Sequence, residues 1–260
     1  MHTKRLRVGT KQLEYVWYGP PPKKAPTLVF LHEGLGCVAM WRDFPEMLAE
    51  RTGCGALVYS RAGYGKSDAA KLPRSVRFMH DEALNTLPQV LDEFQINEAI
   101  LVGHSDGGSI AIIHAGGATR ERLRSLALEA PHVFVEEFGL QSIRRIARDY
   151  QNGDLKHRLE RYHGEHVDET FWGWNDIWRH PQFKGWNIEE YLPLIDVPVL
   201  VIQGEDDQYG TIDQVRAIEA GCSGPVKGVL FQNCGHSPHV DQPERTLKAM
   251  TEFVLADLAR

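Results

Sequence analysis

A serine lies at the centre of a short glycine motif whose residue types and spacing suit nucleophilic catalysis. Residues 103–107 read GHSDG, so Ser105 has one glycine two positions before it and another two positions after it. The motif follows the apolar run Ala99–Val102 and precedes the helix-like run Ser109–Ile113. A serine on a sharp turn between a strand and a helix is exposed beside the amides of the helix N-terminus. The five residues alone are weak evidence, because a glycine-rich turn can contain a serine by chance.

Two later segments contain residues that would complete this chemistry. A serine nucleophile needs a base that accepts its proton and an acid that orients the base. Asp207 ends an acidic GEDD segment that follows the apolar run Val197–Ile202. His236 lies in a GHSP segment that follows another apolar run, Val226–Phe231. Each candidate therefore comes just after a predicted strand, where open α/β sheets place their sites.

Other residues compete for these two supporting roles. Asp206 is adjacent to Asp207, so only one of the two carboxylates can face the histidine. Glu129 ends another predicted strand and remains an alternative acid. His239 is a weaker candidate for the base than His236, because His236 follows the last predicted strand more directly.

Three motifs together resemble those of the α/β-hydrolase family, and the likeness covers nearly the whole chain. Beside the GHSDG motif, residues 61–67 read RAGYGKS and resemble the family's RxGxGxS loop. Residues 32–36 read HEGLG and resemble its HGxxG oxyanion loop, except that Glu33 replaces the usual first glycine. In this order and spacing, the motifs are stronger evidence than any one of them alone.

The resemblance implies a role for each candidate. Ser105, Asp207 and His236 would form a catalytic triad, with Asp207 preferred to its neighbour by the family's GxxD spacing. The amides of Gly34 and Asp106 would form the oxyanion hole.

Two further residues are expected to support the loops. His32 is interpreted as a structural histidine whose ring holds the oxyanion loop. Arg61 is interpreted as a residue that tethers its own loop through an ion pair.

The implied activity is hydrolysis of a small or medium carboxylic ester, apolar or aromatic, through an acyl-enzyme and with no metal or organic cofactor. The same triad also serves carbon–carbon, lactone, thioester and amide hydrolysis. A ligand-binding receptor of the same fold could retain an intact triad as well. The bond and the substrate therefore stay open at this point.

Alternation of apolar runs and helical patterns predicts an α/β architecture. The resemblance implies an α/β-hydrolase fold, with a mostly parallel eight-stranded sheet flanked by helices. Residues 1–131 and 194–260 would form the core, and residues 132–193, which contain no clear strand, would form a helical cap inserted after the sixth strand.

The predicted cap is unusually rich in aromatic residues. Four of the six tryptophans lie between positions 172 and 186. Large rings can hold a helical insertion to the body of a protein, or they can line an apolar pocket. The residues expected to bind substrate are Glu33, Leu35, Trp172, Trp174 and Trp178.

Composition excludes several other classes of protein. The chain has 260 residues, of which 42% are hydrophobic, and a net charge of −6, which argues against a nucleic-acid or acidic-membrane partner. Neither a membrane-length apolar run nor an apolar signal core is visible, so we expect a cytoplasmic monomer or homodimer that acts on a small molecule.

Cysteine and histidine spacing predicts no metal site. The four cysteines, at positions 37, 54, 222 and 234, have no CxxC pair and are expected to be free and reduced. His157, His163 and His166 lie close together but lack a matching carboxylate or cysteine pattern, so a solvated face of the cap is the favoured interpretation.

Overall fold

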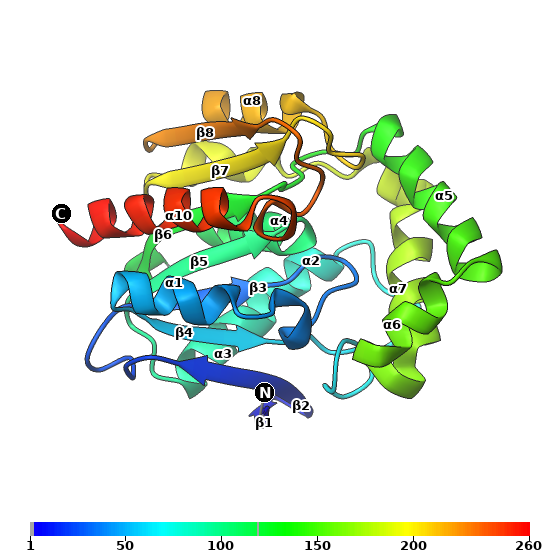
Figure 1. Ribbon diagram of the computed structural model, residues 1–260, viewed down its shortest axis with the longest axis horizontal. Coiled ribbons are helices and arrows are strands. Elements are labelled where there is room, and N and C mark those ends of the chain that lie inside the picture. Colours follow the sequence, from blue (N-terminus) through cyan, green and yellow to red (C-terminus); the bar gives the residue numbers. More distant parts are fainter. Residues whose placement is uncertain (1–2, 119) are drawn as a thin grey trace.

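A single sheet of eight strands organises the molecule (Figure 1). The computed structural model describes residues 3–118 and 120–260. The strand order is β1-β2-β4-β3-β5-β6-β7-β8; β1 and β2 are antiparallel to their neighbours, and the other pairs are parallel. The prediction of a mostly parallel eight-stranded sheet is confirmed. The strands are β1 (Lys4–Val8), β2 (Lys11–Tyr18), β3 (Thr27–Leu31), β4 (Gly55–Tyr59), β5 (Ala99–His104), β6 (Leu123–Glu129), β7 (Val199–Gly204) and β8 (Val226–Phe231).

Helices cover both faces of this sheet. Every residue of β3, β4 and β5 is buried, as expected for parallel strands that read as continuous apolar runs. The helices α1 and α10 pack together over one face, where they bury alternate residues of the central strands. On the other face, α3, α4 and α8 bury the remaining alternate residues. The helices of these two layers are α1 (Phe44–Thr52), α2 (Phe78–Asp81), α3 (Leu87–Glu93), α4 (Asp106–Gly117), α8 (Ile212–Gly221), α9 (Pro238–Asp241) and α10 (Pro243–Leu258), with short 3₁₀ turns η1 (Val38–Trp41) and η3 (Arg120–Arg122).

The helical segment before β5 consists of three consecutive pieces. A π-helical turn, η2 (Glu82–Thr86), joins α2 to α3. Pro88 occupies the first turn of α3, where its missing N–H leaves no helical bond unmade. The wider turn therefore accommodates the proline.

The chain between β6 and β7 folds into helices that lie beyond the carboxyl ends of the parallel strands (Figure 1). None of the strands named above lies in this segment, which instead contains α5 (Glu137–Asn152), α6 (Leu155–His163), η4 (Gly164–His166), α7 (Val167–Trp178), η5 (Pro181–Gly185) and η6 (Glu189–Leu194). The last turn, η6, packs against α4. Helices α5, α6 and α7 are therefore the part of the segment that faces the strand ends.

The four cysteines are free: Cys37, Cys54 and Cys234 are buried and Cys222 is partly buried. None of the helices within the described ranges has the length and apolar composition that crossing a membrane requires.

Candidate active site

Ser105 occupies the turn between β5 and α4 in a backbone conformation that L-residues seldom adopt. Its φ is 53° and its ψ is −117°. The neighbouring chains approach closely: a Cβ at position 107 would overlap the carbonyl oxygen of Leu31, and one at position 103 would lie 2.6 Å from the carbonyl oxygen of Gly107. Gly107 is therefore required by the close approach of β3 to α4, and Gly103 by the close approach of the first turn of α4 to the end of β5.

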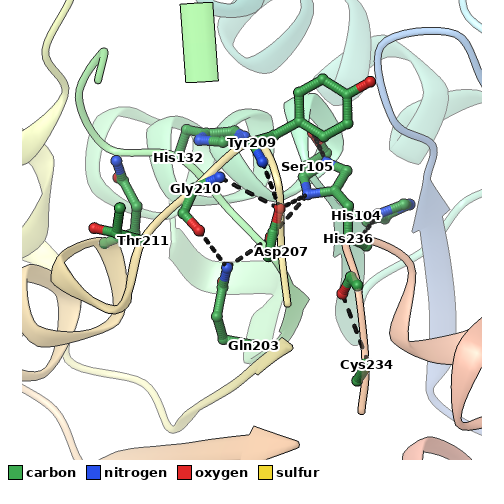
Figure 2. Close-up of polar contacts among 12 residues, drawn as sticks. His104, Ser105, His132, Gln203, Asp207, Tyr209, Gly210, Thr211, Cys234 and His236 are labelled. Atoms are coloured by element: carbon green, nitrogen blue, oxygen red, sulfur yellow. Dashed lines mark hydrogen bonds and ion pairs between the residues drawn. The ribbon is translucent and has the colours of Figure 1, made fainter. Parts of the chain in front are cut away.

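Ser105, His236 and Asp207 form a continuous hydrogen-bonded chain (Figure 2). His236 Nε2 lies 2.9 Å from Ser105 Oγ, and His236 Nδ1 lies 2.9 Å from each carboxylate oxygen of Asp207. The loops after β5, β7 and β8 thus bring together three residues that are far apart in the sequence. Asp206, the neighbouring acid, is exposed.

The Asp207 carboxylate is held from several sides. Oδ1 accepts hydrogen bonds from the amides of Tyr209 (2.7 Å) and Gly210 (3.3 Å), and Oδ2 accepts one from Gln203 Nε2 (2.6 Å). Figure 2 shows these donors converging on the carboxylate from the strand end and from the loop that follows it. Sequence reasoning missed Gln203, because a glutamine within a buried strand carries no catalytic pattern.

The two charges of this pair stabilise each other. Burial alone raises the pKa of Asp207, but the adjacent His236 and the hydrogen bonds to Oδ1 outweigh it, so the net pKa lies below the usual value. Burial lowers the pKa of His236, but the Asp207 carboxylate outweighs burial and raises the net pKa. For nearby His132, burial together with the His236 charge outweighs the opposing effect of the Asp207 carboxylate and lowers its pKa to about 4. His236 is therefore the imidazole in this cluster that is suited to hold a proton transiently.

The loop that carries Gly34 is held from behind by two side chains, those of His32 and Arg61. The carbonyl oxygen of Glu33, which belongs to the same peptide group as the Gly34 amide, lies 2.7 Å from His32 Nδ1 and accepts a 3.1 Å bond from Arg61 Nη2. The Arg61 amide donates to His32 Nε2, which places the ring proton on Nδ1. Hydrogen bonds to a peptide carbonyl polarise the group and strengthen its N–H as a donor.

This arrangement refines the two expectations about supporting residues. His32 does hold the loop of residues 32–36 through its ring, as expected. Arg61 is buried and tethers loops, but the bonds that its guanidinium makes go to the carbonyl oxygens of His32 and Glu33 and not to a carboxylate. Within the described residues, the amides of Gly34 and Asp106 donate no hydrogen bond and remain available to a ligand.

A cavity of about 220 Å³ opens beside Ser105 and His236. Of the residues expected to bind substrate, Glu33, Leu35, Trp174 and Trp178 line it. The Trp174 indole lies so close to Gly34 that a Cβ there would overlap it. Helices α5 and α6 contribute an apolar wall formed by Leu140, Ile143, Ile146, Leu155 and Leu159.

Trp172 is a correction to the expected lining. It borders a separate surface hollow with Leu72 and Arg74, and it is absent from the lining of the Ser105 cavity. Successive residues of a helix are turned by about 100°, so Trp172 and Trp174 point in nearly opposite directions, whereas Trp174 and Trp178 share one face.

The histidines of the predicted cap do not share one solvated face. His163 is buried: its Nδ1 accepts a 3.0 Å bond from the Gly65 amide, and its Nε2 lies 2.9 Å from the Leu35 carbonyl oxygen. It therefore joins α6 to the loop that contains Gly65 and to the loop that contains Leu35. His157 and His166 are exposed, as expected. Among the residues that the structure describes, no group of three His, Cys, Asp or Glu side chains could hold a metal.

Glu129, the rival acid, faces a different histidine. Its Oε2 accepts a 2.9 Å bond from the His239 amide and lies 2.9 Å from His239 Nδ1. Both side chains are buried. Glu129 thus ties β6 to α9, which begins two residues after His236.

Comparisons with known proteins agree on one superfamily. A family model described as "Alpha/beta hydrolase family" matches residues 28–249. A proline iminopeptidase from Saccharolobus solfataricus is 24% identical over 269 aligned positions, which cover 87% of this chain and 84% of the relative. Among solved structures, 2-hydroxy-6-oxo-6-phenylhexa-2,4-dienoate hydrolase from Rhodococcus sp. strain RHA1 superposes with a TM-score of 0.83 at 17% identity, covering 100% of this chain and 99% of the other. An esterase from Exiguobacterium antarcticum superposes with a TM-score of 0.76 at 17% identity, covering 97% and 99%.

Proposed function

Because the chain belongs to the alpha/beta hydrolase family, we propose that it is a serine hydrolase that cleaves small or medium carboxylic esters with an apolar or aromatic group. The observation that carries this proposal is the hydrogen-bonded chain from Ser105 Oγ through His236 to Asp207, which opens onto a cavity with an apolar wall.

In the proposed reaction, His236 Nε2 accepts the Ser105 proton as Oγ attacks the ester carbonyl. Asp207 holds the ring so that Nε2 faces the serine, and it stabilises the imidazolium that forms. His236 then protonates the leaving alcohol, and an acyl-enzyme remains. Water attacks the acyl group with the same proton transfers and releases the acid.

We assign the oxyanion hole to the amides of Gly34 and Asp106. Asp106 is the first residue of α4, so the helix N-terminus adds its positive dipole end to the site. The hydrogen bonds of His32 and Arg61 to the Glu33 carbonyl make the Gly34 N–H a better donor. Each such donor contributes about 3 to 4 kcal/mol in comparable sites.

Residues 132–193 are proposed to form the cap over this site. The apolar side chains that α5 and α6 place on the cavity would bind an acyl or alcohol group. Cleavage of an amide is the second candidate, since the chain is similar along most of its length to a proline iminopeptidase. Hydrolysis rates for an ester and an anilide of the same acid would separate the two.

Replacing the nucleophile tests the proposal directly. A fluorophosphonate probe is expected to label the native protein at Ser105, and Ser105→Ala should lose both labelling and ester hydrolysis, with a fall in kcat on the order of a millionfold. An esterase assay with p-nitrophenyl esters measures the turnover, and mass spectrometry of the labelled peptide identifies the modified residue. Undiminished turnover by Ser105→Ala would exclude the mechanism, and a receptor would show labelling without sustained turnover.

A further inference from the structure

Glu33 places a carboxyl group beside the proposed oxyanion hole. Its Oε2 accepts a bond of 2.5 Å from the Leu35 amide, while Oε1 has no donor among the described residues. The half-buried side chain lines the Ser105 cavity. One oxygen is therefore held by the backbone, and the other is available to whatever enters the cavity.

The charged partner that the lining of the cavity offers this carboxyl group is His236, which is already paired with Asp207. The twenty lining residues contain three acids, Glu33, Asp106 and Glu136, and no lysine or arginine. Glu136 is already occupied, because both of its oxygens accept bonds from Thr211 and Gln214. Asp106 uses Oδ1 to accept a bond from Trp178, and its Oδ2 is buried without a described partner. Hydrogen bonds within the lining therefore leave Glu33 and Asp106 each with one oxygen that has no described donor, and burial raises the pKa of both carboxyl groups.

The carboxyl groups near the cavity outnumber the guanidinium groups that interact with them. The carboxyl groups of Glu33, Asp106 and Glu82 all interact electrostatically with Arg61, and the last two also interact with Arg74. His236 also interacts with Glu33 and Asp106, so two guanidinium groups and one imidazole serve these three carboxyl groups and Asp207. The guanidinium of Arg61 is further engaged by the carbonyl oxygens of His32 and Glu33.

An uncompensated carboxylate at this position would oppose the reaction. Negative charge develops on the substrate oxygen beside Gly34, and a like charge on the adjacent residue raises the barrier. A positively charged substrate group would remove this conflict, because it would pair with Glu33. A substrate carboxylate would make the conflict worse.

We propose that Glu33 recognises a protonated amine carried by the substrate close to the scissile carbonyl, while the apolar cap wall takes an aliphatic or aromatic side chain. The inference rests on the proposed function and names its substrate class: amino-acyl esters or amides with a free amine and an apolar side group. Substrates that carry a carboxylate in place of the amine are excluded.

Matched esters test this assignment. Hydrolysis of leucine methyl ester, methyl 4-methylpentanoate and monomethyl succinate is compared at pH 7, where these esters are mainly cationic, neutral and anionic. We expect kcat/KM to favour the amine over the neutral ester by about tenfold or more, the lower end for a hydrogen bond to a charged group. Glu33→Gln should abolish this preference, chiefly through a fall in kcat/KM for the amine ester relative to the neutral ester. Glu136→Gln, which alters an occupied acid of the same cavity, should preserve the preference.

Binding without turnover separates this inference from the proposed function. Calorimetry with 3-methylbutylamine on Ser105→Ala should show binding that weakens by about tenfold in Ser105→Ala/Glu33→Gln, whether or not the native protein hydrolyses esters. The neutral 3-methylbutanol should show no such difference. Equal amine affinity in the two variants, or an unchanged ester preference in Glu33→Gln, would overturn the assignment of Glu33.

Discussion

Two carboxylate–histidine pairs lie at neighbouring strand ends of this molecule, and they differ in what the second ring nitrogen meets. In both pairs, Asp207–His236 and Glu129–His239, the carboxylate lies 2.9 Å from Nδ1. His236 directs Nε2 to Ser105 Oγ and lines the large cavity. The ring of His239 instead packs against the ring of Trp41, with centroids 4.6 Å apart.

The buried His104 ring separates the two pairs. Its centroid lies 5.2 Å from the ring of His236 and 5.2 Å from that of His239. Burial and the two neighbouring histidines hold its pKa well below the usual value, so it stays neutral. His104 Nε2 also contacts the His236 carbonyl oxygen at 2.7 Å. The comparison teaches that an acid–imidazole pair has a structural or a reactive role according to its surroundings, and not according to its own geometry.

Removing the Asp207 charge should lower kcat far more than removing the Glu129 charge. Asp207→Asn is expected to lower kcat by about four orders of magnitude, because the amide no longer holds the His236 proton on Nδ1. Steady-state ester hydrolysis measures this loss, and the exposed Asp206→Asn is the matched control with near-native kcat. Near-native kcat in Asp207→Asn, together with a large loss of kcat in Glu129→Gln, would show that Glu129 and not Asp207 is the catalytic acid.

The corresponding substitution in the other pair, Glu129→Gln, should lower the free energy of unfolding. Glu129→Gln places an amide where a buried carboxylate accepts two bonds from His239, and the expected loss is about 1 to 3 kcal/mol in the free energy of unfolding. Denaturant unfolding gives this value, and kcat of the folded variant should stay within about tenfold of the native value. An unchanged unfolding free energy would show that the pair does not anchor α9.

The pH profile should report the Asp207–His236 pair alone. His236 acts as a base only when neutral, and its pKa is raised above 6.5, so kcat/KM should fall as the pH drops through a value above 6.5. In Asp207→Asn, where the carboxylate no longer counters burial, the residual activity should persist to lower pH. A limb below pH 6.5 in the native enzyme would contradict this account of the pair.

Tryptophan emission should give the smallest effect and locate the cavity wall. A non-hydrolysable phosphonate bound at Ser105 is expected to change the emission of the native protein, because Trp174 and Trp178 line the cavity. Trp178→Phe should reduce this change, whereas Trp172→Phe should retain it. If the emission change were the same in Trp178→Phe and Trp172→Phe, Trp178 would have a packing role and no contact with the ligand.

The sequence predicted the parts of the site that are encoded locally. Apolar runs place the strands, and a parallel sheet brings their carboxyl ends together, so residues in the loops after β5, β7 and β8 could be expected to meet. Asp207 could be preferred to Asp206 only through the motif spacing of a known family. The partner of Glu129 could not be predicted, since it depends on how α9 packs against the end of β6.

Other features required the rotation and docking of whole helices. The burial of His163 follows from the position of α6 over two core loops, which no local pattern specifies. The exclusion of Trp172 from the cavity follows from the face that α7 turns toward Ser105. Composition can indicate an aromatic pocket, but only the packed structure tells which rings form it.

The backbone at Ser105 also bears on how this protein could change over time. A non-glycine residue at a φ of 53° and a ψ of −117° carries a strain on the order of 1 to 3 kcal/mol, which a glycine would relieve. Ser105→Gly would therefore remove the nucleophile and favour the native state in one step. A lineage released from the demand for catalysis would gain robustness by this change, so inactivation and stabilisation lie on the same mutational path.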